Sequence, residues 1–175
     1  MSVKLGRKIM IIGSGGSGKT TLARKLGEML ILPVTHLDKE FWNFGWIETP
    51  KEEWYEKQRN LVSKPEWIAD GNFGGSLEIR LDNADTIIFL DFNRFVCMRS
   101  VVKRWLTNIG KTRPDMPEGC PEKIDFRFLK WIWQFSLKSR PTIIEKITKY
   151  KNIELITIKS RKKLKQFVNE ISSIQ

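Results

Sequence analysis

The sequence predicts an α/β protein in which helices cover both faces of a five-stranded parallel sheet, a three-layer α/β/α arrangement. Short apolar runs recur along the chain, and each is followed by a segment with apolar residues every three or four positions. This alternation of strand and helix is typical of a parallel sheet, because each strand must return to the same edge through a crossover. A length of 175 residues with 41% hydrophobic content predicts one domain over residues 1–175.

The predicted strands are the five apolar runs 8–12, 33–38, 67–70, 86–91 and 152–158. Helical patterns fill the intervals, at 20–30, about 50–63, 76–81, 93–108, 122–138, 141–150 and 160–171.

A glycine-rich loop lies between the first strand and the first helix. It fits the pattern G-x-x-x-x-G-K-[ST]. Its glycines let backbone N–H groups turn inward toward an anion, and a strand, a glycine loop and a helix N-terminus in this order bind phosphate. Lys19 supplies charge for β- and γ-phosphates, and the Thr20 hydroxyl can ligate Mg²⁺. The residues predicted to bind ATP here are Gly13, Ser14, Gly15, Gly16, Ser17, Gly18, Lys19, Thr20 and Thr21.

Carboxylates follow the predicted second and third strands, at Asp38 and Asp70. Because ligands gather at the carboxyl ends of parallel strands, both should face the phosphate loop. We expect Asp70, or alternatively Asp38, to hold waters of a Mg²⁺ ligated by Thr20. Asp38 is also a candidate to orient or deprotonate an acceptor hydroxyl, or else caps a loop. Asp91, after the fourth strand, is expected to be structural.

A basic segment precedes a stretch punctuated by glycine and proline. Residues 99–113 include five basic residues and no acidic one, and 110–121 contain two glycines and three prolines. This pattern predicts a helical lid insert over about 105–128 that closes on phosphates. Arg104 and Arg113 are predicted to add positive charge around the transferring phosphoryl group. The alternative for Arg104 is an ordinary surface position on a helix.

With these segments, the chain resembles the P-loop nucleotide-kinase superfamily of the adenylate-kinase-like type. Within it, the chain is similar to the group of DNA topology modulation proteins (FlaR-like). The matching segments are 13–20, 36–38, 70–72, 84–91, 97–104, 113–120 and 128–133. The resemblance implies a P-loop NTPase fold with sheet order 2-3-1-4-5 and phosphoryl transfer from ATP. It also implies that the adenine ring packs near Arg161, in the loop after the fifth strand.

One departure from that family concerns the acceptor. In adenylate kinases the Asp-Gly after the third strand is followed by Phe-Pro-Arg, whereas here Asn72-Phe73-Gly74 follows. The arginine that holds the acceptor phosphate is therefore missing, which counts against a nucleoside monophosphate. Arg80 or Arg59 is a candidate replacement.

The sequence thus predicts a kinase that uses ATP and Mg²⁺ to phosphorylate a small-molecule acceptor, with nucleosides and nucleotides among the candidates. The alternative is a nucleic-acid-associated ATP-binding protein, which the net charge of +11 fits. We favour the kinase, because the basic residues concentrate at the lid and the sequence has no helix-turn-helix, RNP or zinc pattern. An NTPase switch without a second substrate is a third possibility.

The expected setting is the cytoplasm, as a monomer or homodimer without membrane contact. No stretch approaches the roughly 20 apolar residues of a membrane helix. The N-terminus shows no apolar region of a signal peptide, and two cysteines do not form a disulfide framework.

Overall fold

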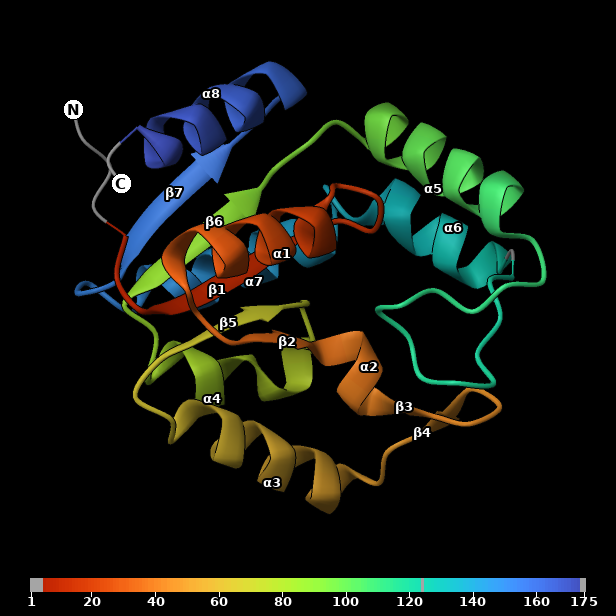
Figure 1. The fold of residues 1–175 in the computed structure, drawn as a ribbon, viewed down its shortest axis with the longest axis horizontal. Coiled ribbons are helices and arrows are strands. Elements are labelled where there is room, and N and C mark those ends of the chain that lie inside the picture. The colour runs from red at the N-terminus through yellow and green to blue at the C-terminus, as the bar shows by residue number, and fades with distance from the viewer. Residues whose placement is uncertain (1–4, 124, 174–175) are drawn as a thin grey trace.

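The computed structural model describes residues 5–123 and 125–173 and contains a five-stranded parallel sheet (Figure 1). The strands are β1 (Lys8–Gly13), β2 (Val34–His36), β5 (Trp67–Asp70), β6 (Thr86–Leu90) and β7 (Glu154–Ile158). Their order across the sheet is β2-β5-β1-β6-β7. Counted along the chain, this is 2-3-1-4-5, so the predicted fold class and strand order are confirmed.

Helices cover both faces of this sheet. They are α1 (Lys19–Leu30), α2 (Leu37–Phe41), α3 (Lys51–Val62), α4 (Leu77–Leu81), α5 (Arg94–Asn108), α6 (Phe126–Gln134), α7 (Ser139–Thr148) and α8 (Arg161–Ser172), with a 3-10 turn, η1 (Gly74–Ser76). The helix predicted over 122–138 is shorter, because Asp125 caps α6 by accepting a hydrogen bond from the Arg127 N–H. The predicted second strand ends at His36, so Asp38 lies in α2 rather than at a strand end.

The core divides into two clusters, one on each face of the sheet. Successive strand residues point to opposite faces. Ile9 and Ile11 of β1 therefore pack in the cluster that includes buried side chains of α1, α5, α6 and α8. Met10 and Ile12 pack in the cluster that includes α3, α4 and α7. All four side chains are fully buried, which fixes β1, and with it the loop that follows, in the middle of the sheet.

An aromatic segment after α2 forms a small antiparallel hairpin, which the sequence analysis does not predict. Its strands are β3 (Trp42–Asn43) and β4 (Ile47–Glu48). Gly45 and Trp46 both adopt positive φ angles in the turn, of 76° and 65°. The Gly45 N–H donates to the Gly119 carbonyl at 3.2 Å, so the hairpin is attached to the segment between α5 and α6.

The segment between α5 and α6 is not helical in its described residues, 109–123 and 125. It folds back on itself through isolated bridges from Ile109 to Glu122 and from Thr112 to Pro121. The predicted helical lid is thus a loop at this point, and only its ends lie in α5 and α6. The three prolines between 114 and 121 oppose a continuous helix, because proline lacks the N–H that helices need.

In the described part of the chain, no helix combines the length and the apolar composition required to cross a membrane.

Candidate active site

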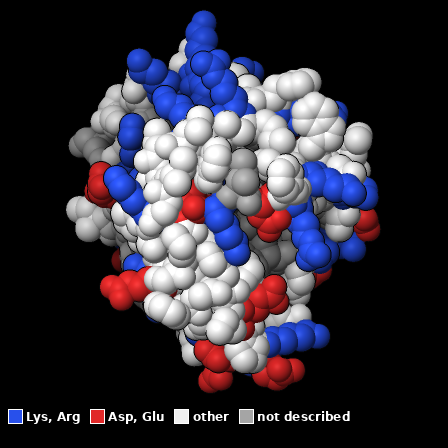
Figure 2. Space-filling view, turned by 90° about the vertical axis from the view of Figure 1, so that its right-hand side faces the viewer, with Lys and Arg blue, Asp and Glu red and all other residues white. Residues whose placement is uncertain are grey.

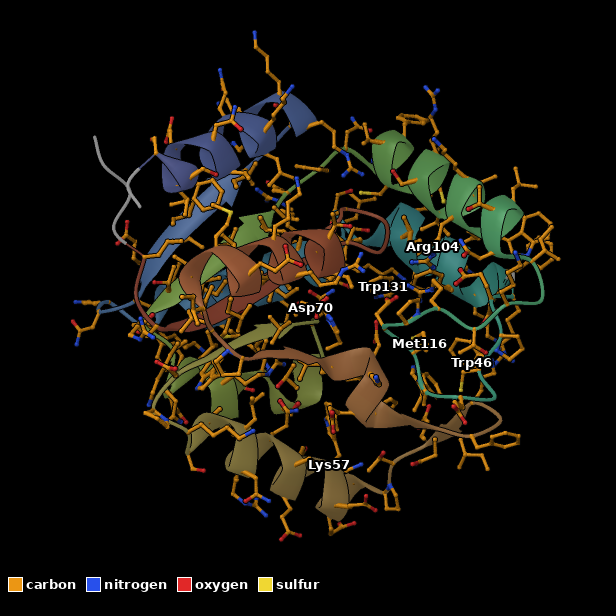
Figure 3. All side chains as sticks on the ribbon, viewed as in Figure 1. Trp46, Lys57, Asp70, Arg104, Met116 and Trp131 are labelled. Carbon is orange, nitrogen blue, oxygen red and sulfur yellow. The ribbon has the colours of Figure 1, made fainter. Side chains whose placement is uncertain are left out.

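A cavity of about 770 Å³ opens at the carboxyl edge of the sheet. Its lining comes from the phosphate loop and the start of α1, from α2, the hairpin, the loop after β5, α5, α6, the segment between them, and Arg161. Figure 3 shows Asp70, Arg104, Trp131, Met116 and Trp46 around this region, with Lys57 on α3 well away from it. This volume is suitable for a bound small molecule, because ligand pockets usually have volumes of about 300–1,000 Å³.

The phosphate loop runs from Gly13 at the end of β1 to Lys19 at the start of α1. Its glycines are required by close contacts. A Cβ atom on Gly16 would lie 2.4 Å from the Cys97 carbonyl oxygen of α5, and Gly16 has a φ of 76°. Asn72 also holds the loop, because its side chain accepts from the Gly13 N–H at 3.0 Å and donates to the Gly13 carbonyl at 2.8 Å. Sequence reasoning gave Asn72 no such role.

Lys19 folds back over this loop. Its Nζ donates to the carbonyls of Gly13 and Ser14 at 3.0 and 2.9 Å. Burial lowers the pKa of Lys19, although Asp38 and Asp70 oppose that shift by attracting its charge. A phosphate at the loop would give this buried ammonium an anionic partner in place of neutral carbonyls.

Asp70 is held from two sides at the end of β5. The Thr20 hydroxyl donates to Asp70 Oδ2 at 2.7 Å, and His36 Nδ1 lies 2.5 Å from Asp70 Oδ1. The hydrogen bond to Asp70 raises the pKa of His36, while burial opposes the rise. The sequence analysis gives roles to Thr20 and Asp70 and none to His36. The missed signal was the register, because β2 and β5 pair His36 with Asp70.

Thr20 and Asp70 fit a Mg²⁺ site, because hydroxyl and carboxylate oxygens are ligands that this ion prefers. Among the described residues, no cluster of three or more His, Cys, Asp or Glu side chains could enclose a metal. An ion at Thr20 would therefore take its remaining ligands from water and from phosphates, as Mg²⁺ commonly does.

Asp38, on α2, also lines the cavity. The surrounding protein raises the pKa of Asp38 by limiting its hydration; Lys19 opposes this rise and Asp70 adds to it. A raised pKa makes the carboxylate a stronger proton acceptor. Asp38 thus shares a cavity with the phosphate loop, as the sequence predicts, but it lies in a helix and not at a strand end.

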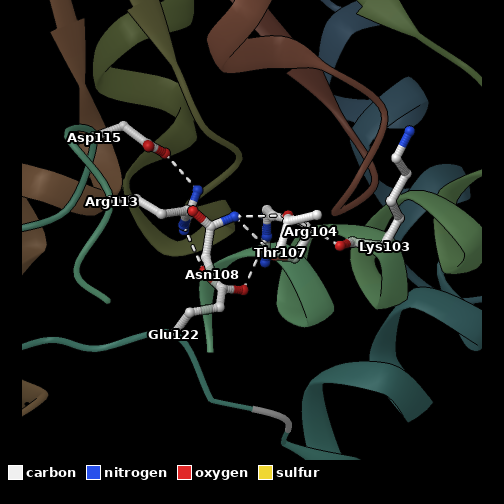
Figure 4. A network of polar contacts seen from close by, with 7 residues as sticks. All are labelled: Lys103, Arg104, Thr107, Asn108, Arg113, Asp115 and Glu122. Carbon is white, nitrogen blue, oxygen red and sulfur yellow. Dashed lines mark hydrogen bonds and ion pairs between the residues drawn. The ribbon is translucent and has the colours of Figure 1, made fainter. Parts of the chain in front are cut away.

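Arg104 and Arg113 converge on the buried carboxylate of Glu122 (Figure 4). Arg104 Nε donates to Glu122 Oε1 at 2.9 Å, and Arg113 Nε lies 2.6 Å from Glu122 Oε2. Arg113 also donates from Nη1 to Asp115 at 2.6 Å. The structure thus brings the two predicted arginines together at the cavity, but each one has a carboxylate partner that sequence reasoning did not anticipate.

Arg80 and Arg59 do not replace the missing acceptor arginine. Arg80 is completely buried and donates to the carbonyls of Gly71, Asn72 and Phe73, which fixes the loop after β5. Burial lowers the pKa of Arg80 to about 9, which still leaves the group charged at neutral pH. Arg59 is exposed on α3 and does not line the cavity.

Asp91 and Arg161 also have defined contacts. Asp91 forms a two-pronged ion pair with Arg140, with both N–O distances at 2.9 Å, which agrees with a structural role. Arg161, at the start of α8, donates to the Gly16 carbonyl at 3.1 Å and to Ser100 Oγ at 3.0 Å. Its guanidinium lies 5.1 Å from the centre of the Phe92 ring. The Arg161 side chain thus adjoins the phosphate loop.

The glycine loop on a central parallel strand, with this sheet order, defines a P-loop NTPase fold of the kind found in kinases. Comparison with protein-family models and with curated proteins finds no match. Membership of the DNA topology modulation group therefore stays a prediction.

Solved structures of small-molecule kinases share this fold. A shikimate kinase from Acinetobacter baumannii, in complex with shikimate, is 15% identical with a TM-score of 0.57, covering 97% of this chain and 94% of that one. A gluconokinase from Sinorhizobium meliloti is 12% identical with a TM-score of 0.57, covering 98% and 92%. A sugar kinase from a Janibacter species is 14% identical with a TM-score of 0.52, covering 95% and 92%. At these identities the likeness shows the fold.

Proposed function

We propose that this protein is a kinase that transfers the γ-phosphoryl group of ATP to a small-molecule acceptor, with Mg²⁺ as cofactor. The observation that carries the proposal is the shared cavity, because the phosphate loop, Asp38, Arg104 and Arg113 all line it. A pure nucleotide switch would not need a carboxylate and two arginines on the wall beyond the phosphate loop. The shared fold with three solved small-molecule kinases supports the proposal.

The proposed roles follow from the contacts. Phosphoryl transfer depends mainly on positioning and on neutralising charge. Lys19 and the loop N–H groups bind the β- and γ-phosphates, and Arg161 lies beside the nucleotide. Thr20 and Asp70 would hold Mg²⁺, which neutralises phosphate charge when it is bound. Asp38 orients the acceptor hydroxyl and takes its proton.

Arg104 and Arg113 add positive charge around the transferred group in this scheme. Glu122 joins the two arginines and so sets where their guanidinium groups lie. The segment between α5 and α6 acts as the lid.

The test combines nucleotide binding with detection of transfer. Titration calorimetry of the intact protein with ATP and Mg²⁺ should show binding of ATP. Lys19→Met should weaken this binding at least about tenfold, because methionine removes the cation and keeps most of the length of the side chain. Lys151→Met, at an exposed position before β7 and so at the opposite edge of the sheet, is the matched control and should bind ATP as the wild type does. Phosphorus NMR of acceptor mixtures should show ADP together with a new phosphate ester. Unchanged nucleotide binding by Lys19→Met, with no ester formed from any acceptor, would rule out the proposed function.

A further inference from the structure

The part of the cavity farthest from α8 has an apolar wall. Trp42 and Trp46 of the hairpin line it, with their rings edge to face and 5.4 Å apart between centres. Phe73, from the loop after β5, and the buried Met116 add to the same lining. The hairpin lies beyond the β2–β5 side of the sheet (Figure 1), and Figure 3 shows Met116, from the segment between α5 and α6, near Trp46. We refer to Trp42, Trp46, Phe73 and Met116 as the aromatic wall.

Arg104 and Arg113, two cations of the cavity lining, are already paired with carboxylates. Glu122 pairs with both Arg104 and Arg113, and Asp115 pairs with Arg113 a second time. Two positive charges thus face two negative ones. The Glu122 side chain is only 5% exposed, and those of Arg113 and Asp115 are 15% and 16% exposed. The remaining N–H groups of these arginines can still face the transferred phosphoryl group, but an anionic acceptor would have to compete with Glu122 and Asp115 for a positive charge that these carboxylates already balance.

Other charges in this part of the cavity do not favour an anion. Asp38 forms no ion pair in the described part of the chain, and its carboxylate would repel an anionic acceptor. Lys123 lies 4.8 Å from the centre of the Trp46 ring, but it is exposed, so solvent and salt weaken its attraction for an anion. Arg24 lines the cavity without an ion pair among the described residues, but it is exposed on α1 and so in contact with water. Its attraction for an anion is therefore weakened by solvent and salt.

We infer that the acceptor is an uncharged hydroxyl compound with one apolar face, of the sugar or nucleoside kind, and not a carboxylate or a phosphate ester. This inference rests on the proposed function and names its substrate class. The apolar face packs on Trp42 and Trp46, and a hydroxyl lies beside Asp38. The acceptor oxygen forms a bond to the γ-phosphorus of ATP as the bond to the β–γ bridging oxygen breaks. ADP leaves, and the hydroxyl proton passes to the Asp38 carboxylate and then to water.

The loop after β5 supports this assignment. Asn72-Phe73-Gly74 follow Asp70 and Gly71 there, and none of the three is a cation. The structure uses Asn72 to hold Gly13 and places Phe73 on the cavity wall. Arg80, the nearest cation in sequence, is fully buried against three backbone carbonyls. An aromatic ring and a structural amide thus stand where a phosphate-binding side chain would be required.

Matched acceptors test the inference on the intact protein. Each uncharged compound is compared with its anionic counterparts: glucose with gluconate and glucose 6-phosphate, and further sugars, polyols and nucleosides with their acids or monophosphates. Thermal shift with a non-hydrolysable ATP analogue and Mg²⁺ reports binding, and phosphorus NMR with ATP reports transfer. We expect the uncharged member of a pair to bind and to be phosphorylated at least about tenfold better.

A charge variant provides a second readout. Asp115→Asn removes one partner of Arg113 and should raise the affinity for the anionic member, relative to the uncharged one, by about tenfold. Glu118→Gln is the matched control, because it removes an acid from the same loop at an exposed position and should leave the preference unchanged. Thermal unfolding of both variants shows whether they are folded.

The outcomes separate the two proposals. Preferred phosphorylation of anionic members overturns the inference and leaves the kinase function intact, most clearly if Arg24→Ala then abolishes the preference. An unchanged preference in a folded Asp115→Asn variant overturns the role of the paired arginines in excluding anions. Tight ATP binding without a phosphate ester from either class of acceptor overturns the proposed function, and the inference with it.

Discussion

At the scale of single residues, Glu122 is the side chain on which the basic part of the site depends. It is buried, and its carboxylate forms ion pairs with Arg104 of α5 and with Arg113 of the segment between α5 and α6. Without it, Arg104 and Arg113 would repel one another, and a repulsion from Arg113 already contributes to the lowered pKa of Arg104, after burial. The carboxylate thus lets two cations lie close together beside the phosphate loop.

We predict that Glu122→Gln lowers the free energy of unfolding by about 2–3 kcal/mol, because it weakens charge-assisted hydrogen bonds to two partly buried arginines. Urea denaturation monitored by tryptophan fluorescence measures the change. Glu118→Gln, in the same loop but exposed, should stay within about 0.5 kcal/mol of the wild type. Equal stability of the two variants would contradict a stabilising role for Glu122.

His36 gives a prediction with a defined pH dependence. Its pKa is raised in the folded protein, mainly by the hydrogen bond to Asp70. Protonated His36 therefore stabilises the fold. This stabilisation is fully present below the ordinary histidine pKa of about 6.5 and is lost as the pH rises through the higher folded value. His36→Gln should thus be most destabilising in mild acid, and its effect should diminish with rising pH.

Urea denaturation of both proteins from about pH 5.5 to about pH 8.5 tests this trend. Proton NMR gives a direct check, because His36 is the single histidine of the chain and its ring signals need no assignment by mutation. A folded-state titration below the ordinary value, or a difference in stability that grows with pH, would contradict the prediction.

At the scale of elements, the ends of two neighbouring strands use the same residue type differently. Asp70 is the last residue of β5 and accepts a hydrogen bond from the Thr20 hydroxyl of α1, whereas Asp91 follows β6 and pairs with Arg140 of α7. In the sequence, each of these aspartates comes directly after an apolar run. The two aspartates differ in the helix that each one contacts. Of the two, only Asp70 contacts the start of α1, directly after the phosphate loop.

We therefore predict that Asp70→Asn raises the Mg²⁺ concentration needed for ATP binding about tenfold or more, since it removes a carboxylate beside the metal-binding hydroxyl. Asp91→Asn should leave that concentration unchanged and lower stability by up to about 1 kcal/mol through its partly exposed pair with Arg140. Calorimetry with ATP over a range of Mg²⁺ concentrations compares the two. A metal requirement that moves with Asp91 instead would reassign the site.

The sequence predicts regular elements well where local patterns determine them. The strands and the phosphate loop follow from apolar runs and from a motif with a fixed spacing, and the sheet order follows from family resemblance. The β3–β4 hairpin was not predicted, because each of its strands has only two residues and its turn places Trp46 at a positive φ, which few residues with side chains adopt. Asp38 was placed on the correct side of the molecule because α2 follows β2 without a gap.

At the site, the contacts between residues far apart in the sequence could not be predicted. Glu122 lies 18 positions from Arg104, and its neighbourhood carries no motif. Likewise, no pattern shows that Arg80 turns inward to three carbonyls of its own loop instead of toward a ligand. An arginine in a sequence indicates a charge, but its partner is fixed only by tertiary structure.

At the scale of the whole molecule, charge is unevenly distributed. Figure 2 shows Lys and Arg side chains gathered at the top of one face, at the level of α8 and α5, and several Asp and Glu side chains toward its bottom. The net charge is +11. A surface of this kind attracts polyanions without any specific site, so DNA binding in dilute buffer would not by itself support the nucleic-acid function.

We predict that binding of duplex DNA, measured by fluorescence anisotropy, weakens steeply with salt and does not respond to ATP. Lys162, Lys163 and Lys165 are exposed at the start of α8. Replacing all three with Gln should reduce the slope of log K against log salt by up to about 0.9 per lost phosphate contact. The same variant should bind ATP as the wild type does, because the three lysines do not line the cavity. DNA binding that instead persists at physiological salt and is strengthened by ATP would mean that nucleotide and nucleic acid are coupled. The basic surface would then belong to the function of the protein, and the nucleic-acid alternative would be favoured over a small-molecule acceptor.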